Sequence, residues 1–198
     1  MKPIRAITGT AVPLDRSDVD TDQIIPASWL KRVERTGFGQ GLFSEWRDDR
    51  DFVLNKPEYA GATILVAGAN FGIGSSREHA VWALMDYGFE AVISPRFGDI
   101  FRNNSTKAGL LPVQVEPEVG AALLSAVAED PSLEITIDLE RLRLEAPSAG
   151  IEASFPLDPF TQHRLLEGLD DIGLTLRFAD AIAEYETTRP SWLPSLTS

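Results

Sequence analysis

Through the middle of the chain, apolar runs of strand length alternate with segments of helical periodicity. Residues 62–68 form a continuous apolar run, which is typical of a strand buried on both faces of a sheet. Residues 75–87 place Ala80, Ala83 and Leu84 on one side of a helix. The alternation continues with strands expected at 90–95 and 111–115 and a short helix at 96–109 that ends at Gly109. The pattern predicts an α/β fold.

The flanking regions predict further elements. Residues 4–14 are rich in β-branched side chains and predict one or two short strands, and residues 117–130 predict a helix with Pro117 in its first turn. The alternating runs 133–139 and 141–146 predict a β pair with Glu140 between them, and 159–186 is helical in pattern. We therefore expect one domain over 1–186 and a proline-containing tail over 187–198.

Residues 31–60 lack this regularity and predict a long, partly irregular excursion. Such an excursion inside a compact domain is usually functional or mobile. Gly37, Gly39 and Gly41 permit several backbone conformations, so we expect mobility within 31–43 when no partner is bound.

Composition excludes several classes of function. Lys plus Arg number 18 against 30 Asp plus Glu, a net charge of -12, which disfavours nucleic acid and anionic membranes as partners. The chain has no cysteine, which excludes disulfides and any thiolate-bound metal or iron–sulfur cluster built from this chain alone. His79 and His163 have no partner at metal-ligand spacing, so we expect no metal. No signal peptide or membrane span is expected, and the cytoplasm is the default location.

Residues 66–80, VAGANFGIGSSREHA, carry the most informative chemistry. The predicted buried strand runs into three glycines, which allow a sharp turn and a close approach of ligand to backbone. A helix N-terminus attracts anions, and the guanidinium of Arg77 binds carboxylates with two prongs. Because ligands bind where strands of an open α/β sheet end, the segment predicts an anion site.

Competing interpretations of this segment differ in strength. Ser75-x-x-Glu78 also matches a capping box, in which Ser75 does no more than begin the helix. A dinucleotide site is disfavoured, because Arg77 stands where that fingerprint needs a small residue for close helix packing. No Gly-Lys-Ser or Gly-Lys-Thr of a Walker motif occurs.

Several ordered motifs resemble the swivelling domain of the aconitase superfamily. GIGSSREHA resembles its active-site loop, DVDTDQIIPASWL (18–30) its N-terminal aspartate motif, and RFGDIFRNNSTKAGLLPV (96–113) the helix and strand that follow. RTGFGQGLF (35–43), WALMDYGF (82–89) and TRPSWLP (188–194) are similar to the small subunit of bacterial 3-isopropylmalate dehydratases. The resemblance covers most of the chain.

The resemblance implies a three-layer β/β/α domain on a separate chain, which works with a large iron–sulfur subunit. That subunit would hold a [4Fe–4S] cluster whose open iron takes the leaving hydroxyl as a Lewis acid, and this chain would bind no cofactor itself. The family reaction interconverts the dicarboxylates 2-isopropylmalate and 3-isopropylmalate by dehydration and rehydration in leucine biosynthesis.

The resemblance also implies roles for particular residues. Ser75 matches the catalytic base, Arg77 the carboxylate binder and Ser76 a hydrogen-bonding neighbour. Asn70 matches a residue of the same loop, and Asp22 matches the aspartate of the N-terminal motif near the active-site cleft.

A further arginine of the family has no clean match. WLKRVERTG offers Arg35, which we favour as a substrate contact, and Arg32, while a solvated basic stretch is an equal alternative. Leu30, Val33 and Phe38 are candidates for the apolar pocket of an isopropyl group. Two other functions stay open: a related hydro-lyase acting on homoaconitate or a methylmalate, and a non-catalytic anion-binding module.

Overall fold

A single mixed sheet organises the body of the molecule. The computed structural model describes residues 1–31, 36–75, 77–189 and 192. In these residues seven strands pair in the order β4-β3-β2-β1-β5-β6-β7. Their bounds are Ala6–Leu14 (β1), Ile64–Ala67 (β2), Ala91–Ser94 (β3), Leu111–Gln114 (β4), Glu134–Asp138 (β5), Arg143–Ala146 (β6) and Ile151–Ser154 (β7).

The parallel half of the sheet consists of β4, β3, β2 and the C-terminal part of β1. Every residue of β2 and β3 is buried, as their continuous apolar runs require. All three strands predicted from those runs are confirmed, with ends shifted by one or two residues. The carboxyl ends of these strands meet at one edge, from which the loops that follow β1 and β2 leave.

The antiparallel half begins at the other part of β1, which pairs with β5. The predicted β5–β6 pair is confirmed, but its connection is longer than one residue. The turn is closed where the amide of Arg141 donates to Asp138 Oδ1 over 2.9 Å, and Leu142 takes a positive φ of 55°. Strand β7 was not predicted, because its alternation spans only four residues.

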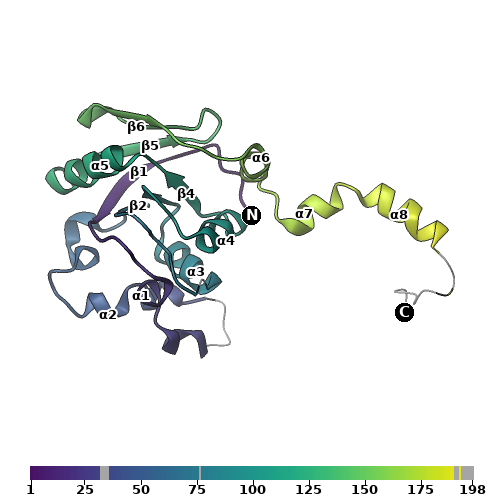
Figure 1. Cartoon of the computed structure of the whole chain (residues 1–198), viewed down its shortest axis with the longest axis horizontal. Coiled ribbons are helices and arrows are strands. Elements are labelled where there is room, and N and C mark those ends of the chain that lie inside the picture. The colour runs from purple at the N-terminus through teal and green to yellow at the C-terminus, as the bar shows by residue number, and fades with distance from the viewer. Residues whose placement is uncertain (32–35, 76, 190–191, 193–198) are drawn as a thin grey trace.

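Helices cover both sides of the curled sheet (Figure 1), which confirms the predicted α/β class. Helix α5 (Pro117–Glu129) contacts β1, β2 and β3 as well as β7, so it bridges the two halves. Helix α4 (Asp99–Ala108) packs on β4 and on α3 (Glu78–Tyr87). Pro117 lies in the first turn of α5, and Gly109 closes α4 in the left-handed conformation, both as predicted.

The segment between β1 and β2 folds into single helical turns around aromatic side chains. Phe43 stacks on Trp46 with ring centroids 5.2 Å apart, and Phe52 meets both rings edge-on. Arg16 lies over the Trp46 ring at 4.2 Å. The turns are α1 (Thr21–Ile24), η1 (Ala27–Lys31), η2 (Phe38–Gly41), α2 (Ser44–Arg47), η3 (Val53–Asn55) and η4 (Pro57–Tyr59).

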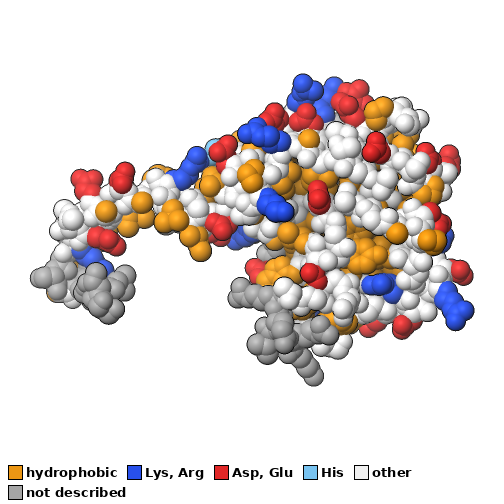
Figure 2. Space-filling view, turned by 180° about the vertical axis from the view of Figure 1, so that it is seen from behind, with side chains coloured by type: hydrophobic (Ala, Val, Ile, Leu, Met, Phe, Trp, Pro, Cys, Tyr) orange, Lys and Arg blue, Asp and Glu red, His pale blue; other side chains and the backbone are white. Residues whose placement is uncertain are grey.

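The C-terminal helices leave the body of the molecule. Helix α6 (Pro159–Glu167) still packs against it through buried Leu165. Helices α7 (Asp171–Leu176) and α8 (Ala179–Thr188) project away from it as an arm (Figure 1). Hydrophobic side chains are exposed along this arm (Figure 2). No helix in the described part of the chain is long and apolar enough to cross a membrane.

Candidate functional site

The loop between β2 and α3 is held by backbone hydrogen bonds to two other segments. On one side, the amides of Gly72 and Ile73 donate to the Val19 carbonyl over 2.7 and 3.2 Å, and the Thr21 amide donates to the Ile73 carbonyl. On the other side, the Phe71 amide donates to the Arg96 carbonyl over 2.9 Å. The loop is therefore a built element of the domain, and its path is determined by segments distant in the sequence.

Close packing explains two of the glycines that mark this region. A Cβ on Gly72, whose φ is +73°, would lie 2.3 Å from the Phe101 ring. A Cβ on Gly98 would lie 2.4 Å from the Gly72 carbonyl oxygen. Neither distance leaves room for a side chain, so the loop approaches α4 as closely as the backbone allows.

Three aspartates of the preceding motif have three different partners. Asp18 Oδ1 accepts a 2.6 Å hydrogen bond from Asn70 Nδ2. Asp20 caps α1: its carboxylate accepts from the Gln23 amide over 2.9 Å, and the Gln23 side chain accepts from the Asp20 amide over 2.9 Å. Asp22 forms an ion pair with Arg77. The sequence prediction assigned Asp22 and Asn70 and missed Asp18, whose role depends on a contact 52 residues away.

Ser75 does not begin α3, so the capping-box interpretation is wrong. The helix begins at Glu78, its N-cap residue is Arg77, and no side chain caps it. The predicted helix therefore starts three residues too early, and Arg77 stands before the first turn instead of on it. The true capping box is Asp20-x-x-Gln23, a signal of the same kind. Ser75 lies exposed in the loop after Gly74, which takes a φ of +91°.

Arg77 and Asp22 form the charged centre of the candidate site. Arg77 Nη1 donates to Asp22 Oδ1, and the two side chains are 28% and 51% exposed. A guanidinium carries five N–H donors, so this pair leaves Arg77 with donors for another carboxylate. The fold thus brings Asp22, Asn70, Ser75 and Arg77 to one edge of the sheet. The candidates Ser76, Arg35 and Arg32 lie outside the described residues.

The expected apolar pocket is corrected at one position. Phe38 is 1% exposed and packs against His79 and Trp82, with ring centroids 5.3 and 5.9 Å apart, so its ring cannot line an open pocket. Leu30 is half-buried, and Val33 lies outside the described residues. His79 packs among aromatic rings, and His163 Nε2 lies 2.8 Å from Arg177 Nη1.

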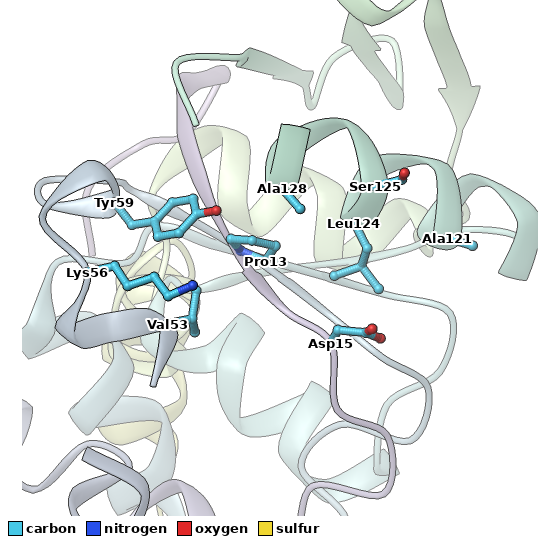
Figure 3. A pocket seen from close by; sticks show the side chains of 9 residues that line it. All are labelled: Pro13, Asp15, Val53, Lys56, Tyr59, Ala121, Leu124, Ser125 and Ala128. Carbon is cyan, nitrogen blue, oxygen red and sulfur yellow. The ribbon is translucent and has the colours of Figure 1, made fainter. Parts of the chain in front are cut away.

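A surface cavity of about 510 Å³ lies away from these residues, between α5, the end of β1 and the η3–η4 turns (Figure 3). It contains none of the predicted site residues. Burial and the nearby Glu58 carboxylate raise the pKa of the Tyr59 hydroxyl. The cavity is lined by Pro13, Asp15, Val53, Lys56, Tyr59, Ala121, Leu124, Ser125 and Ala128.

The residues of this chain do not fit an iron–sulfur cluster. Cluster irons are held chiefly by cysteine thiolates, and the sequence contains no cysteine. Among the described residues, no three His, Asp or Glu side chains gather in a way that could hold a metal ion.

The fold and the loop between β2 and α3 belong to a known class, the aconitase C-terminal domains. A family model described as the aconitase C-terminal domain matches residues 1–118, more than half of the chain, and includes the whole candidate site. A second model, which describes the C-terminal domain of the 3-isopropylmalate dehydratase small subunit, matches residues 171–197, which include α7 and α8.

Relatives narrow the class to one family. A 3-isopropylmalate dehydratase small subunit of Frankia alni is 65% identical over 188 residues and covers 95% of both chains. One from Rubrobacter xylanophilus is 57% identical over 194 residues, 98% of both chains. The crystal structure of a 3-isopropylmalate dehydratase chain from Methanocaldococcus jannaschii matches with a TM-score of 0.65 at 26% identity, over 91% of this chain and 99% of that one. The chain belongs to the family of 3-isopropylmalate dehydratase small subunits.

Proposed function

We propose that this chain, assembled with a large iron–sulfur subunit, interconverts 2-isopropylmalate and 3-isopropylmalate by dehydration and rehydration. One observation carries the proposal: an exposed serine follows a glycine turn and stands two residues before an arginine whose guanidinium is already paired with a carboxylate. Family membership over 95% of the chain supports the choice of reaction. The absence of cysteine supports placing the [4Fe–4S] cluster on the large subunit.

In this proposal Ser75 removes or returns the proton next to a substrate carboxylate. A serine alkoxide is costly to form in water, so it requires nearby positive charge and hydrogen-bond donors. Arg77 supplies that charge and holds a substrate carboxylate through the donors that Asp22 leaves free. Asp22 orients the guanidinium, because an ion pair from α1 restricts the side chain to one direction.

Asn70 acts further back in the same loop. Its side chain donates to Asp18, and the residue takes a φ of +59°, which asparagine tolerates better than most side chains. The bond ties the start of the loop to the aspartate motif. Ser76 and Arg35 complete the proposed set as substrate contacts, with Arg32 as the alternative to Arg35.

The test is Ser75→Ala in the purified two-subunit enzyme. A positioned general base contributes about 10²–10⁴-fold, so we expect kcat to fall by that factor, while the two subunits still assemble on gel filtration. Because Ser75 caps no helix, the thermal midpoint should stay at the wild-type value. Ser154→Ala, at an exposed position on β7, is the matched control.

Two further measurements test the proposed function. The chain without its partner should show no turnover, and activity of the chain alone would refute the division of labour. A Ser75→Ala enzyme within tenfold of the wild-type rate would refute the proposed base. Initial rates with 2-isopropylmalate, homoaconitate and 2-methylmalate compare this activity with those of related hydro-lyases.

A further inference from the structure

Helix α3 begins without a side-chain cap directly after Arg77. The first turn of a helix leaves backbone N–H groups unpaired, and an uncapped end frays readily. Glu78, the first residue of this turn, is exposed and adds no packing. Ala80 of the same turn is completely buried, so the position of Arg77 depends on how this turn packs against other segments.

An aromatic cluster forms part of this packing. His79, in the first turn of α3, packs against Trp82 with ring centroids 4.7 Å apart and against Phe38 at 5.3 Å. Phe38 also meets Trp82 at 5.9 Å and is almost completely buried. Phe38 belongs to the η2 turn, more than 40 residues earlier in the chain, so the cluster joins a distant segment to the start of α3.

The η2 turn is itself held tightly on α3. The amide of Gly39 donates to Asp86 Oδ2 over 2.9 Å, and a Cβ on Gly39 would lie 2.8 Å from the Tyr87 amide nitrogen. A Cβ on Gly41 would lie 2.5 Å from the Trp29 ring. Of the three glycines in this region, only Gly37 takes a positive φ. Gly39 and Gly41 thus serve close packing in this structure, and the expected mobility of residues 31–43 without a partner stays a prediction.

The same part of the chain is also tied to α1, the element that carries the partner of Arg77. The Phe43 amide donates to the Ile24 carbonyl over 2.8 Å, which ties the end of η2 to α1, and α1 carries Asp22. The η2 turn thus packs on α3, and Phe43, two residues after it, is bonded to α1, so this part of the chain is tied to both elements that present the Arg77–Asp22 pair.

We propose that Phe38, His79 and Trp82 are positioning residues, which fix the first turn of α3 and thereby hold the Arg77 guanidinium beside Asp22, where it receives a substrate carboxylate. The inference rests on the proposed function, in which Arg77 binds substrate. It assigns His79 a packing role, since its ring contacts Phe38 and Trp82.

The test compares His79→Ala with His79→Phe in the assembled enzyme. A shift of about 1 Å in a binding group can cost 10²-fold, so we expect His79→Ala to raise KM for 2-isopropylmalate by about tenfold or more. We expect kcat to fall as well, because Arg77 also supplies charge beside Ser75. His79→Phe retains a ring and should restore KM to within about twofold of wild type. Trp82→Ala should repeat the effect of His79→Ala, with Trp82→Phe as its conservative counterpart.

A competitive inhibitor shows whether the substitutions weaken recognition of the carboxylates or of the alkyl group. Malate carries the two carboxylates without the isopropyl group, so its Ki should rise by the same factor as KM. If Ki stays at the wild-type value while KM rises, the cluster shapes the alkyl site and the proposal is overturned. The proposal is equally overturned if His79→Ala leaves KM unchanged, or if His79→Phe fails to restore it.

Two reference variants distinguish a misplaced Arg77 from other causes of a raised KM. Gly109→Ala strains a left-handed helix end next to Met1, far along the chain from η2, and should lower the thermal midpoint with KM unchanged. If it raises KM as His79→Ala does, general destabilisation is the cause and the inference fails. Arg77→Ala should raise KM and Ki on its own. If it does not, the proposed function fails at Arg77, whatever the cluster does.

Discussion

The body of the molecule and its C-terminal arm use apolar residues in opposite ways. In the body, β2 and β3 are buried throughout, and Phe71 is completely buried against Phe101 of α4. In the arm, Ile172 and Phe178 remain 70% and 66% exposed. Both regions carry apolar side chains at helix and strand positions, but only in the body are these side chains packed within the described chain.

The difference teaches that periodicity alone does not stabilise a short helix. Isolated helices under about 12–15 residues are marginal in water, and most helical stability in proteins comes from packing. Helices α7 and α8 have 6 and 10 residues and bury none of their side chains. The arm thus contributes little to the stability of the body. The small-subunit family model begins at 171, where the arm begins, whereas the aconitase C-terminal model ends at 118, inside the body.

The largest effect on stability is expected in the body, at Phe71→Ala. The ring is fully buried and meets Phe101 edge-on at 5.4 Å, so its removal leaves a cavity beneath the site loop. Substitutions of this kind cost about 3–5 kcal/mol. Urea unfolding of the chain, followed by tryptophan fluorescence, measures the loss. A cost below about 1 kcal/mol would mean that the loop is not part of the cooperative core.

An intermediate effect is expected at α6, the helix between body and arm. Asp158 caps it by accepting from the Thr161 amide over 2.9 Å. Hydrogen bonds from the Thr161 side chain and then from its amide lower the pKa of Asp158. Asp158→Ala should cost about 1 kcal/mol at neutral pH. A folded pKa below the unfolded one gives stability that is present above the ordinary aspartate pKa and lost as pH falls through the folded value.

The difference in stability between wild type and Asp158→Ala should therefore shrink on acidification below the ordinary aspartate range. Thermal melts at neutral and acid pH measure this convergence, and Asp158→Asn, which keeps an acceptor without the charge, is the matched control. A difference that is independent of pH would show that the charge does not contribute.

The smallest effect is expected in the arm, at Phe178→Ala. Because the ring is exposed, its truncation should change the free energy of unfolding of the isolated chain by less than about 0.5 kcal/mol. The same urea experiment tests it beside Phe71→Ala. A loss of more than about 1 kcal/mol would break the comparison, because the arm would then be stabilising the body.

Sequence reasoning placed the strands and helices of the parallel half and the loop at its edge. It succeeded there because continuous apolar runs, Pro117 and Gly109 are local signals. It failed at Phe38, where an aromatic residue beside a glycine-rich stretch was interpreted as the wall of a pocket. Its burial depends on His79 and Trp82, and no local pattern connects these three residues.

The two capping boxes show the same limit within the site. Ser75-x-x-Glu78 and Asp20-x-x-Gln23 are equivalent as patterns, yet only the second caps a helix. The choice depends on where α3 begins, and that depends on long-range contacts of the loop with Val19 and Arg96.

By itself, the sequence determined the order of the elements in the parallel half, the family resemblance, and the lack of thiolates for a cluster. Each of these depends on local periodicity, motif or residue type. Only the tertiary structure decided which apolar faces are covered and which charges meet. Arg77 and Asp22 stand 55 residues apart, and Phe38 and His79 more than 40, so no helical or strand period relates them. They come together because the loops after β1 and β2 leave the sheet at one edge, where the parallel strands end.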